Sequence, residues 1–280
     1  MDINTALKFG SLKLKKNNIF SYNLDTEILM SKVFKKKREE IILNMDCELN
    51  YSQIIFFKKL LDERSKGKPI SYIIGRKDFW KNEFIINESS LIPRPDSELI
   101  VQEVLKYLKN KPFSKLLEIG VGSGCILLSV LNERKSCYGT GIDISKECIN
   151  LSKINSKKLG IINRIKFYKS DIDNFNFGKY DLIISNPPYI KKQDIKYLEK
   201  DIVNFEPIKA LDGGLDGLSE IKKVINRSSK LIKLKGKLFL EIAFDQKREV
   251  LSLLKNRGFY INKVLKDLGN NDRCVICTKI

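Results

Sequence analysis

Apolar residues near the amino terminus recur at the spacing of helices that pack one face against a core. The stretches with this spacing cover residues 3–14, 25–37 and 52–61. Asp25 is of a residue type favoured immediately before a helix, so we expect it to open the second helix. The pattern predicts a small helical domain over residues 1–75.

Strand-forming residues replace the helical spacing over residues 76–87. Phe79-Trp80 precede the turn-prone pair Lys81-Asn82, and Phe84-Ile85-Ile86 follow it. We therefore expect a β-hairpin, in a linker over residues 76–90, between the helical domain and the rest of the chain.

From residue 114 onward, strand-like and helix-like segments alternate, which is the pattern of a parallel sheet covered by helices on both faces. Two more strand-like segments and a loop complete the chain. The fold class is thus α/β, with a seven-stranded, mostly parallel sheet in a domain over residues 91–280. The expected strands cover residues 116–119, 138–142, 165–168, 180–185, 238–242, 260–265 and 274–279.

The composition limits the chemistry. The 280 residues include no histidine, which excludes Ser-His and Cys-His nucleophilic pairs and histidine-ligated zinc. Only Cys274 and Cys277, of six cysteines, have a spacing found in metal or redox sites. They fall in a strand-like run, where residues three apart face opposite sides of a sheet. We expect no metal site.

No apolar run approaches the roughly 18 residues of a membrane span, and no signal-peptide pattern follows Met1. We expect a cytoplasmic protein with no membrane partner. The formal net charge is +18, but the basic residues are spread along the whole chain. This distribution favours a compositional bias over a nucleic-acid-binding face.

A glycine-rich segment, Glu118-Ile-Gly120-Val-Gly122-Ser-Gly124, links the first strand of the sheet to a helix. Glycines there let a ligand approach the backbone and the N–H groups of the helix terminus. Asp143 ends the next strand, where its carboxylate can accept hydrogen bonds from both hydroxyls of a ribose. The glycine order G-x-G-x-G differs from the G-x-G-x-x-G that binds a pyrophosphate. An adenosine-type cofactor without phosphates, such as S-adenosylmethionine, fits better than NAD.

The tetrapeptide Asn186-Pro187-Pro188-Tyr189 follows the fourth strand of the sheet. Open α/β sheets bind ligands beyond the carboxyl ends of their strands, so we expect it to face the glycine-rich segment. The side-chain oxygen of Asn186 and the rigid carbonyl of Pro187 can accept the two hydrogens of a planar NH2 group. Orientation of that nitrogen towards a methyl donor then provides most of the catalysis. Tyr189 is expected to form a flat wall against the acceptor.

These motifs resemble those of class I methyltransferases that modify amide or exocyclic amino nitrogens. Further segments resemble the peptide chain release factor glutamine methyltransferase family: Gly67-Lys-Pro-Ile-Ser-Tyr72-Ile-Ile-Gly75, Leu91-Ile-Pro-Arg94-Pro95-Asp96-Ser-Glu98-Leu99, Phe205-Glu206-Pro207, Leu211-Asp-Gly213-Gly214-Leu-Asp216-Gly217-Leu218 and Asp267-Leu-Gly-Asn-Asn-Asp272-Arg273. The resemblance covers residues 67–280, and the helical region matches in type more than in sequence.

The resemblance implies that the glutamine of the Gly-Gly-Gln tripeptide in bacterial class 1 release factors is methylated at N5, with S-adenosylmethionine as donor. It places Asn186, Pro187, Pro188 and Tyr189 at the glutamine. It implies donor contacts at Glu118, Gly120, Val121, Gly122, Ser123, Gly124, Asp143, Asp171, Ile172 and Asn186. Nucleic acid is expected nearby only through the ribosome. Two departures are Ile172, where relatives often carry an aromatic residue, and Ala243, where they often carry glycine.

Three other functions remain open at this point. An adenine-N6 DNA or RNA methyltransferase would also suit the tetrapeptide, but it needs a recognition surface for a flipped base, and the helical region contains no recognisable motif of that kind. A ribosomal protein L3 glutamine methyltransferase shares the tetrapeptide, but its preceding segment is less like residues 92–96. A binding module without turnover is disfavoured by the intact donor and acceptor motifs.

Overall fold

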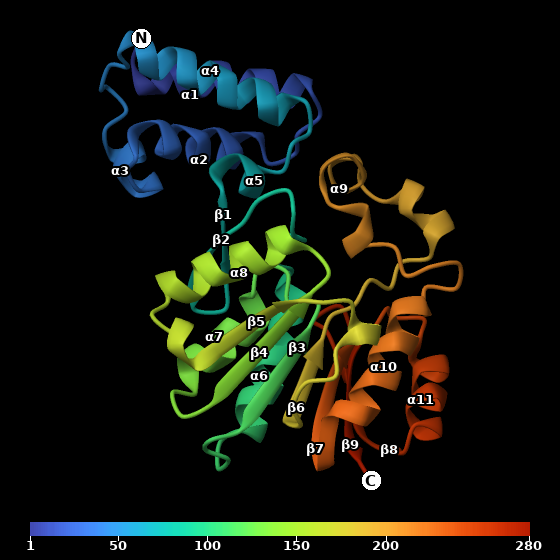
Figure 1. The fold of residues 1–280 in the computed structure, drawn as a ribbon. Helices are drawn as coiled ribbons and strands as arrows, with labels where there is room; N and C mark the ends of the chain where they lie inside the picture. Colours follow the sequence, from blue (N-terminus) through green and yellow to red (C-terminus); the bar gives the residue numbers. More distant parts are fainter. The chain divides into compact units, whose positions relative to one another are not determined.

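The computed structural model describes residues 1–280, which form two compact units (Figure 1). The first unit comprises Met1–Gly75 and Glu199–Phe205, and the second comprises Arg76–Leu198 and Glu206–Ile280. None of the helices has the length and apolar character needed to cross a bilayer.

The first unit is helical and has its own apolar core. Gly10 lies where three helices meet: a Cβ atom there would come within 2.6 Å of Thr26, 3.1 Å of Leu61 and 3.2 Å of Phe57. The missing side chain therefore allows close packing of the first, second and fourth helices. The helices of this unit are α1 (Ile3–Lys16), α2 (Tyr22–Phe34), α3 (Arg38–Leu43), α4 (Tyr51–Ser65), α5 (Ile70–Ile74) and α9 (Lys200–Phe205).

The expectation that Asp25 opens the second helix is wrong. Helix α2 begins at Tyr22, so Asp25 lies in its first turn, and its side chain is buried. Arg64 Nε donates to Asp25 Oδ2 at 2.6 Å, and Ser21 Oγ donates to the same oxygen at 2.8 Å. The carboxylate thus pairs with a buried arginine instead of capping helix N–H groups. The helix also ends earlier than expected, because Lys35 adopts a left-handed conformation with φ of 54°.

A hairpin of β1 (Arg76–Phe79) and β2 (Asn82–Ile85) opens the second unit. Its turn consists of Trp80 and Lys81, one residue earlier than the expected pair, because Phe79 pairs with Asn82. Trp80 adopts a φ of 56°, and both its backbone and its side chain donate hydrogen bonds to carboxylates. Its backbone N–H donates to Glu98 at 2.7 Å, and its indole Nε1 donates to Glu133 at 2.6 Å.

A seven-stranded sheet forms the centre of the second unit, in the order β5-β4-β3-β6-β7-β9-β8. The first five strands in this order pair in parallel, and β9 runs antiparallel to both of its neighbours. The predicted seven-stranded, mostly parallel sheet is therefore confirmed. The strands are β3 (Lys115–Ile119), β4 (Tyr138–Asp143), β5 (Ile165–Lys169), β6 (Tyr180–Ser185), β7 (Ile232–Glu241), β8 (Phe259–Lys266) and β9 (Asp272–Lys279).

Strand β7 begins six residues before the expected residue 238. The added part is polar and irregular: its pairing with β6 shifts register after Tyr180, and Lys235 has a φ of 62°. A two-residue alternation does not continue through such a shift, so the pattern detects only the regular second half of the strand.

Helices cover both faces of the sheet, as predicted (Figure 1). On one face, a Cβ atom at Gly139 of β4 would come within 2.6 Å of Leu131 and 3.3 Å of Leu127, so the helix carrying these leucines packs closely there. The helices packed together on this side are α6 (Glu98–Tyr107), α7 (Cys125–Glu133) and α8 (Lys146–Lys158). On the other face, apolar residues of α10 (Ser219–Leu231) and α11 (Lys247–Asn256) join the buried residues of the strands in one core.

The parallel strands end at one edge of the sheet. Glu118, Asp143 and Glu241 lie in the last residues of β3, β4 and β7, and Asn186 follows β6 directly. Sequence positions far apart are thus brought to the same edge, where open α/β sheets bind their ligands.

Candidate active site

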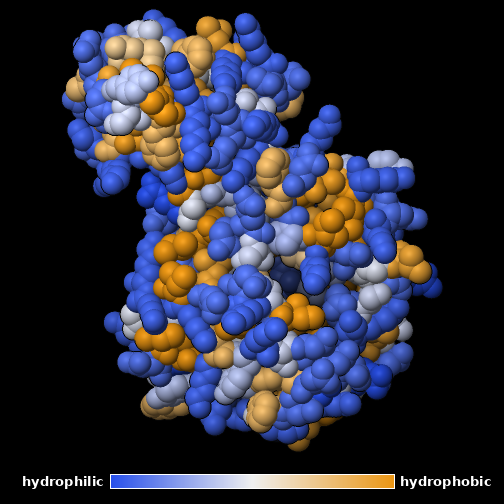
Figure 2. Space-filling view, turned by 45° about the horizontal axis from the view of Figure 1, so that its top comes forward, coloured by the Kyte–Doolittle hydropathy of each residue, from blue (hydrophilic) through white to orange (hydrophobic).

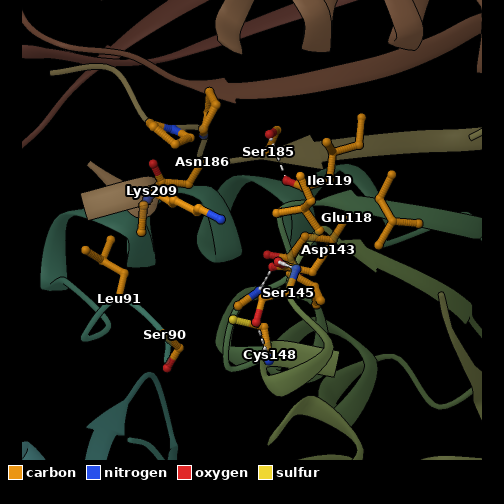
Figure 3. Close-up of a pocket in the computed structure, with 18 of the residues that line it drawn as sticks. Ser90, Leu91, Glu118, Ile119, Asp143, Ser145, Cys148, Ser185, Asn186 and Lys209 are labelled. Atoms are coloured by element: carbon orange, nitrogen blue, oxygen red, sulfur yellow. Dashed lines mark hydrogen bonds between the residues drawn. The ribbon is translucent and has the colours of Figure 1, made fainter. Parts of the chain in front are cut away.

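A cavity of about 990 Å³ opens at this edge of the sheet. Figure 2, which brings the edge forward, shows a hollow there, and Figure 3 shows side chains from several segments around the same space. The cavity is lined by most of the residues that the sequence indicated: Glu118, Gly120, Val121, Gly122, Ser123, Asp143, Asp171, Ile172, Asn186, Pro187 and Pro188. Gly124 and Tyr189 are the two indicated residues that do not line it.

The glycine-rich turn shapes one wall of the cavity. Gly120, Gly122 and Gly124 have positive φ angles of 76°, 54° and 84°, which side chains on an L residue disfavour. Gly124 also lacks room, because a Cβ atom would lie 2.7 Å from Leu128 in the following helix. The turn is therefore dictated by backbone conformation at three positions and by helix packing at the last.

Asp143 fixes the glycine turn from the neighbouring strand. The backbone N–H of Gly122 donates to its Oδ2 at 2.9 Å, and that of Ser145 donates to its Oδ1 at 2.9 Å. Each carboxylate oxygen keeps further acceptor capacity towards the cavity. Burial raises the pKa of Asp143, and the two backbone donors oppose this shift.

Glu118 lies at the base of the cavity with only 2% of its surface exposed. Its Oε2 accepts a hydrogen bond from the backbone N–H of Leu127 at 3.1 Å. Burial raises the pKa of Glu118 well above its usual range, and the nearby Asp143 adds to the shift. A cationic ligand group placed beside this carboxyl would offset the cost of its ionisation.

Contacts at both ends of the tetrapeptide loop after β6 fix the position of its backbone. Ser185 Oγ donates to the carbonyl of Ile119 at 2.9 Å, which ties the end of β6 to the end of β3. Gln246 Nε2 donates to the carbonyl of Tyr189 at 3.0 Å. A Cβ atom at Gly213 would lie 2.8 Å from Tyr189 Cα, so glycine at 213 permits the loop to pack against this segment.

Within the loop, the side chains of Asn186 and Tyr189 point to a common network. Asn186 Nδ2 donates to Ser97 Oγ at 3.0 Å, and Ser97 Oγ donates to Glu241 Oε2 at 2.7 Å. The hydroxyl of Tyr189 donates to Glu241 Oε1 at 3.3 Å. The phenol of Tyr189 is thus turned towards Glu241, and its role as a flat wall against the acceptor stays a prediction.

Polar and apolar groups line the remaining walls. Asp171 Oδ1 accepts from the backbone N–H of Asp173 at 2.9 Å, while Ile172 is partly buried and packs against the apolar core that the strands share with α10 and α11. Arg94 Nη2 donates to the buried Glu206 at 2.5 Å. Figure 3 shows the side chain of Lys209 extending into the space between the Asn186 and Asp143 sides.

Ser97 and Glu241 are two further residues of this network, and no motif in the sequence indicates them as site residues. Ser97 directly follows Arg94-Pro95-Asp96, and Glu241 lies two residues before Ala243. A carboxylate at the end of an apolar strand, Leu238-Phe-Leu-Glu241, is the signal that was available, because such a group is buried only with a partner.

Known protein families and relatives match both units of the chain. The family described as PrmC N-terminal domain matches residues 5–75, and the family described as Methyltransferase small domain matches residues 97–261. The release factor glutamine methyltransferase of Buchnera aphidicola subsp. Baizongia pistaciae is 39% identical over 283 residues, covering 100% of both chains. That of Clostridium acetobutylicum is 35% identical, covering 100% of this chain and 99% of its own.

A solved structure, that of ribosomal protein L11 methylase from Lactobacillus delbrueckii subsp. bulgaricus, is similar in fold. It matches with a TM-score of 0.50 and 17% identity, over 73% of this chain and 89% of its own. This likeness concerns the architecture of the sheet and its helices.

Proposed function

This chain belongs to the release factor glutamine methyltransferase family, and on that premise we propose that it methylates the side-chain amide nitrogen, N5, of the Gly-Gly-Gln glutamine in class 1 release factors. It is an S-adenosylmethionine-dependent methyltransferase of protein glutamine. The observation that carries the substrate proposal is the convergence of the glycine turn and the Asn186 loop on one cavity.

The cavity has the size and the chemistry that the donor requires. Sites for ligands of this size measure about 300–1,000 Å³, so 990 Å³ leaves room for an acceptor side chain beside the donor. When bound, S-adenosylmethionine supplies an electrophilic methyl group on a positively charged sulfur. We assign the ribose hydroxyls to Asp143 and the positively charged amino group to Glu118, because both carboxyls face the cavity. Ile172 is assigned to the adenine, which it would contact through apolar surface.

The acceptor is assigned to the loop after β6. The side-chain oxygen of Asn186 accepts no hydrogen bond from the chain, and it would accept one hydrogen of the glutamine NH2. The carbonyl of Pro187 would accept the other. Once both hydrogens are held, the nitrogen faces the methyl carbon, and orientation provides most of the rate enhancement.

The proton requires no histidine. An amide nitrogen becomes far more acidic once methylated, so the proton leaves to water after the transfer. The residues of this chain therefore have to orient the amide and exclude competing water. They need not remove a proton beforehand.

The helical unit is proposed to dock the protein substrate. Residues 5–75 match a separate family model, and this unit has a core of its own. A docking role predicts that intact release factor is a far better substrate than a short Gly-Gly-Gln peptide, because binding energy remote from the reacting amide is used to position it. Release factors act on ribosomes, so we place the reaction in the cytoplasm and expect nucleic acid nearby only through the ribosome.

The test supplies labelled S-adenosylmethionine with release factor, ribosomal protein L3 or DNA in parallel. We expect label on the release factor, lost when its Gly-Gly-Gln glutamine is replaced by glutamate. Preferential labelling of L3 or of adenine would refute the proposed substrate. A chain that binds the donor but labels none of the three would favour a binding module.

A further inference from the structure

A chain of hydrogen bonds links the loop after β6 to two buried side chains: Ser97, which lines the cavity, and Glu241, which does not. It runs from Asn186 Nδ2 to Ser97 Oγ at 3.0 Å and from Ser97 Oγ to Glu241 Oε2 at 2.7 Å. Ser97 and Glu241 are 3% and 2% exposed. The three residues come from different parts of the chain: the turn before α6, the end of β7 and the loop after β6.

The chemistry of these groups fixes the direction of the chain. An ionised carboxylate only accepts hydrogen bonds, so the hydroxyl of Ser97 must donate its single hydrogen to Glu241. The oxygen of Ser97 is then left as an acceptor for Asn186. The Asn186 carboxamide must therefore turn its NH2 towards Ser97, and its oxygen faces the other way.

This orientation matters because a carboxamide has two nearly isosteric ends. Rotation by about 180° about its last torsion exchanges the oxygen for the NH2 with little change in shape. In the rotated state, the NH2 of Asn186 would meet the NH2 of an acceptor amide, and two donors cannot form a hydrogen bond. An unsupported asparagine would thus spend part of its time unable to hold the acceptor.

We propose that Ser97 and Glu241 are positioning residues that lock the Asn186 carboxamide with its oxygen towards the acceptor amide. The inference rests on the proposed function, which assigns Asn186 to the acceptor NH2. Glu241 also accepts from the hydroxyl of Tyr189 at 3.3 Å, so the same carboxylate restrains both ends of the tetrapeptide.

The protonation state of Glu241 changes within the pH range of an enzyme assay. Burial raises the pKa of Glu241 to about 7, while the hydrogen bond from Ser97, the nearby Arg273 and the hydrogen bond from Tyr189 oppose the shift, and the charge of Asp96 adds to it. Below this pH, the protonated carboxyl can donate to Ser97. The hydroxyl of Ser97 can then donate to the side-chain oxygen of Asn186, and this hydrogen bond stabilises the rotated carboxamide. The groups around Glu241 from the packed elements are Asp96, Ser97, Cys125, Tyr189, Arg273 and Cys274.

The test compares Ser97→Ala and Ser97→Thr with Ser129→Ala in the full-length protein. Ser129 is a matched control, because it is fully buried and its hydroxyl has no hydrogen-bond partner. Donor affinity is measured by calorimetry, and kcat and KM are measured with labelled donor and release factor. We expect Ser97→Ala to lower kcat by about 10- to 100-fold with donor affinity within about twofold. Ser97→Thr should recover most of the rate because it keeps the hydroxyl, and Ser129→Ala should match wild type.

A second readout is the pH profile. Wild-type kcat should fall as pH decreases through about 7, since the ionised form that orients Ser97 is lost. In Glu241→Gln this acid limb should disappear, because the amide does not titrate in that range. A wild-type profile that is flat across this range, or an acid limb that persists in Glu241→Gln, would overturn the positioning role of the Glu241 carboxylate.

The remaining outcomes separate the two proposals. If wild type methylates release factor and Ser97→Ala turns over like Ser129→Ala, the positioning role is overturned and the proposed function stands. Parallel loss of kcat and donor affinity in Ser97→Ala, or a Ser97→Thr variant as slow as Ser97→Ala, also overturns it. If wild type methylates none of the acceptors, both proposals are overturned.

Discussion

Gly213→Ala tests how the acceptor loop is held, because Gly213 does not line the cavity but packs against the backbone of Tyr189. Its φ is not in the left-handed region, so alanine is compatible with the local backbone conformation. A Cβ atom would, however, lie 2.8 Å from Tyr189 Cα and 2.7 Å from the carbonyl oxygen of Gly217. Both neighbours are backbone atoms, which cannot rotate away as a side chain can.

The magnitude follows from this geometry. Ordinary contact begins at 3.4 Å, so the 2.8 Å separation must grow by about 0.6 Å. The segment around Gly213 cannot absorb all of this shift, because its N–H donates to the carbonyl of Ile190 at 2.8 Å. The loop must therefore move by a few tenths of an ångström. A displacement of about 1 Å costs on the order of 100-fold in rate, so we expect kcat to fall by about 10- to 100-fold, or about 1.4–2.7 kcal/mol of activation free energy.

The assay measures kcat and KM on release factor, donor affinity by calorimetry, and the thermal unfolding temperature. Gly269→Ala serves as a control, because its φ is also not left-handed and an added Cβ would meet only side-chain atoms of Asn271 and Asp267. We expect Gly213→Ala to lose turnover with donor affinity unchanged, and Gly269→Ala to retain both. Wild-type kcat in Gly213→Ala would refute the view that this contact sets the position of the loop.

Asn186→Ala removes the proposed acceptor of one amide hydrogen, so kcat should fall about 100-fold while calorimetric donor affinity stays within about twofold; equal loss of both would contradict the role. Asp143→Ala should weaken donor binding at least about tenfold, and unaltered affinity would remove the ribose assignment. Because burial raises the pKa of Asp143, wild-type donor affinity should be full at neutral to alkaline pH and decline on acidification, as the ionised carboxylate is lost; a pH-independent affinity would contradict this. Arg64→Leu leaves the buried carboxylate of Asp25 unpaired, so denaturant titration should show a loss of about 3–5 kcal/mol in the free energy of unfolding. Lys13→Ala, which breaks a far more exposed ion pair with Asp62, should lower the free energy of unfolding by less than about 1 kcal/mol. Equal losses in the two variants would contradict the view that burial makes the Arg64–Asp25 pair more important for stability.

The parts of the site that the sequence predicts share one property: each is a short run at the end of a strand. The glycine turn, Asp143 and the tetrapeptide need only the local pattern and the rule that parallel strands end at one edge. Their convergence on the cavity follows without knowledge of side-chain packing. The same holds for the sheet, whose strands alternate with helices in regular order.

What the sequence leaves undetermined depends on partners far along the chain. Ser97 and Glu241 are 144 residues apart, and Asn186 lies 89 residues from Ser97. No spacing rule joins them. Asp25 shows the same limit in the other direction, since its residue type indicates a helix cap while Arg64, 39 residues away, captures the carboxylate. Local preference gives way where a buried charge has a tertiary partner.

The proposed assignments place donor binding and acceptor orientation on different strands. The turn and Asp143 belong to β3, β4 and their loops, whereas Asn186, Tyr189 and Glu241 belong to β6 and β7. The two halves meet where β3 and β6 pair in parallel, and there the hydroxyl of Ser185 also donates to the carbonyl of Ile119. Substitutions in the first half should therefore act on donor affinity and those in the second on kcat. The proposed reaction suits a chain without histidine. Its rate depends on the orientation of a planar amide towards the methyl donor, so it requires a rigidly held acceptor amide more than a general base.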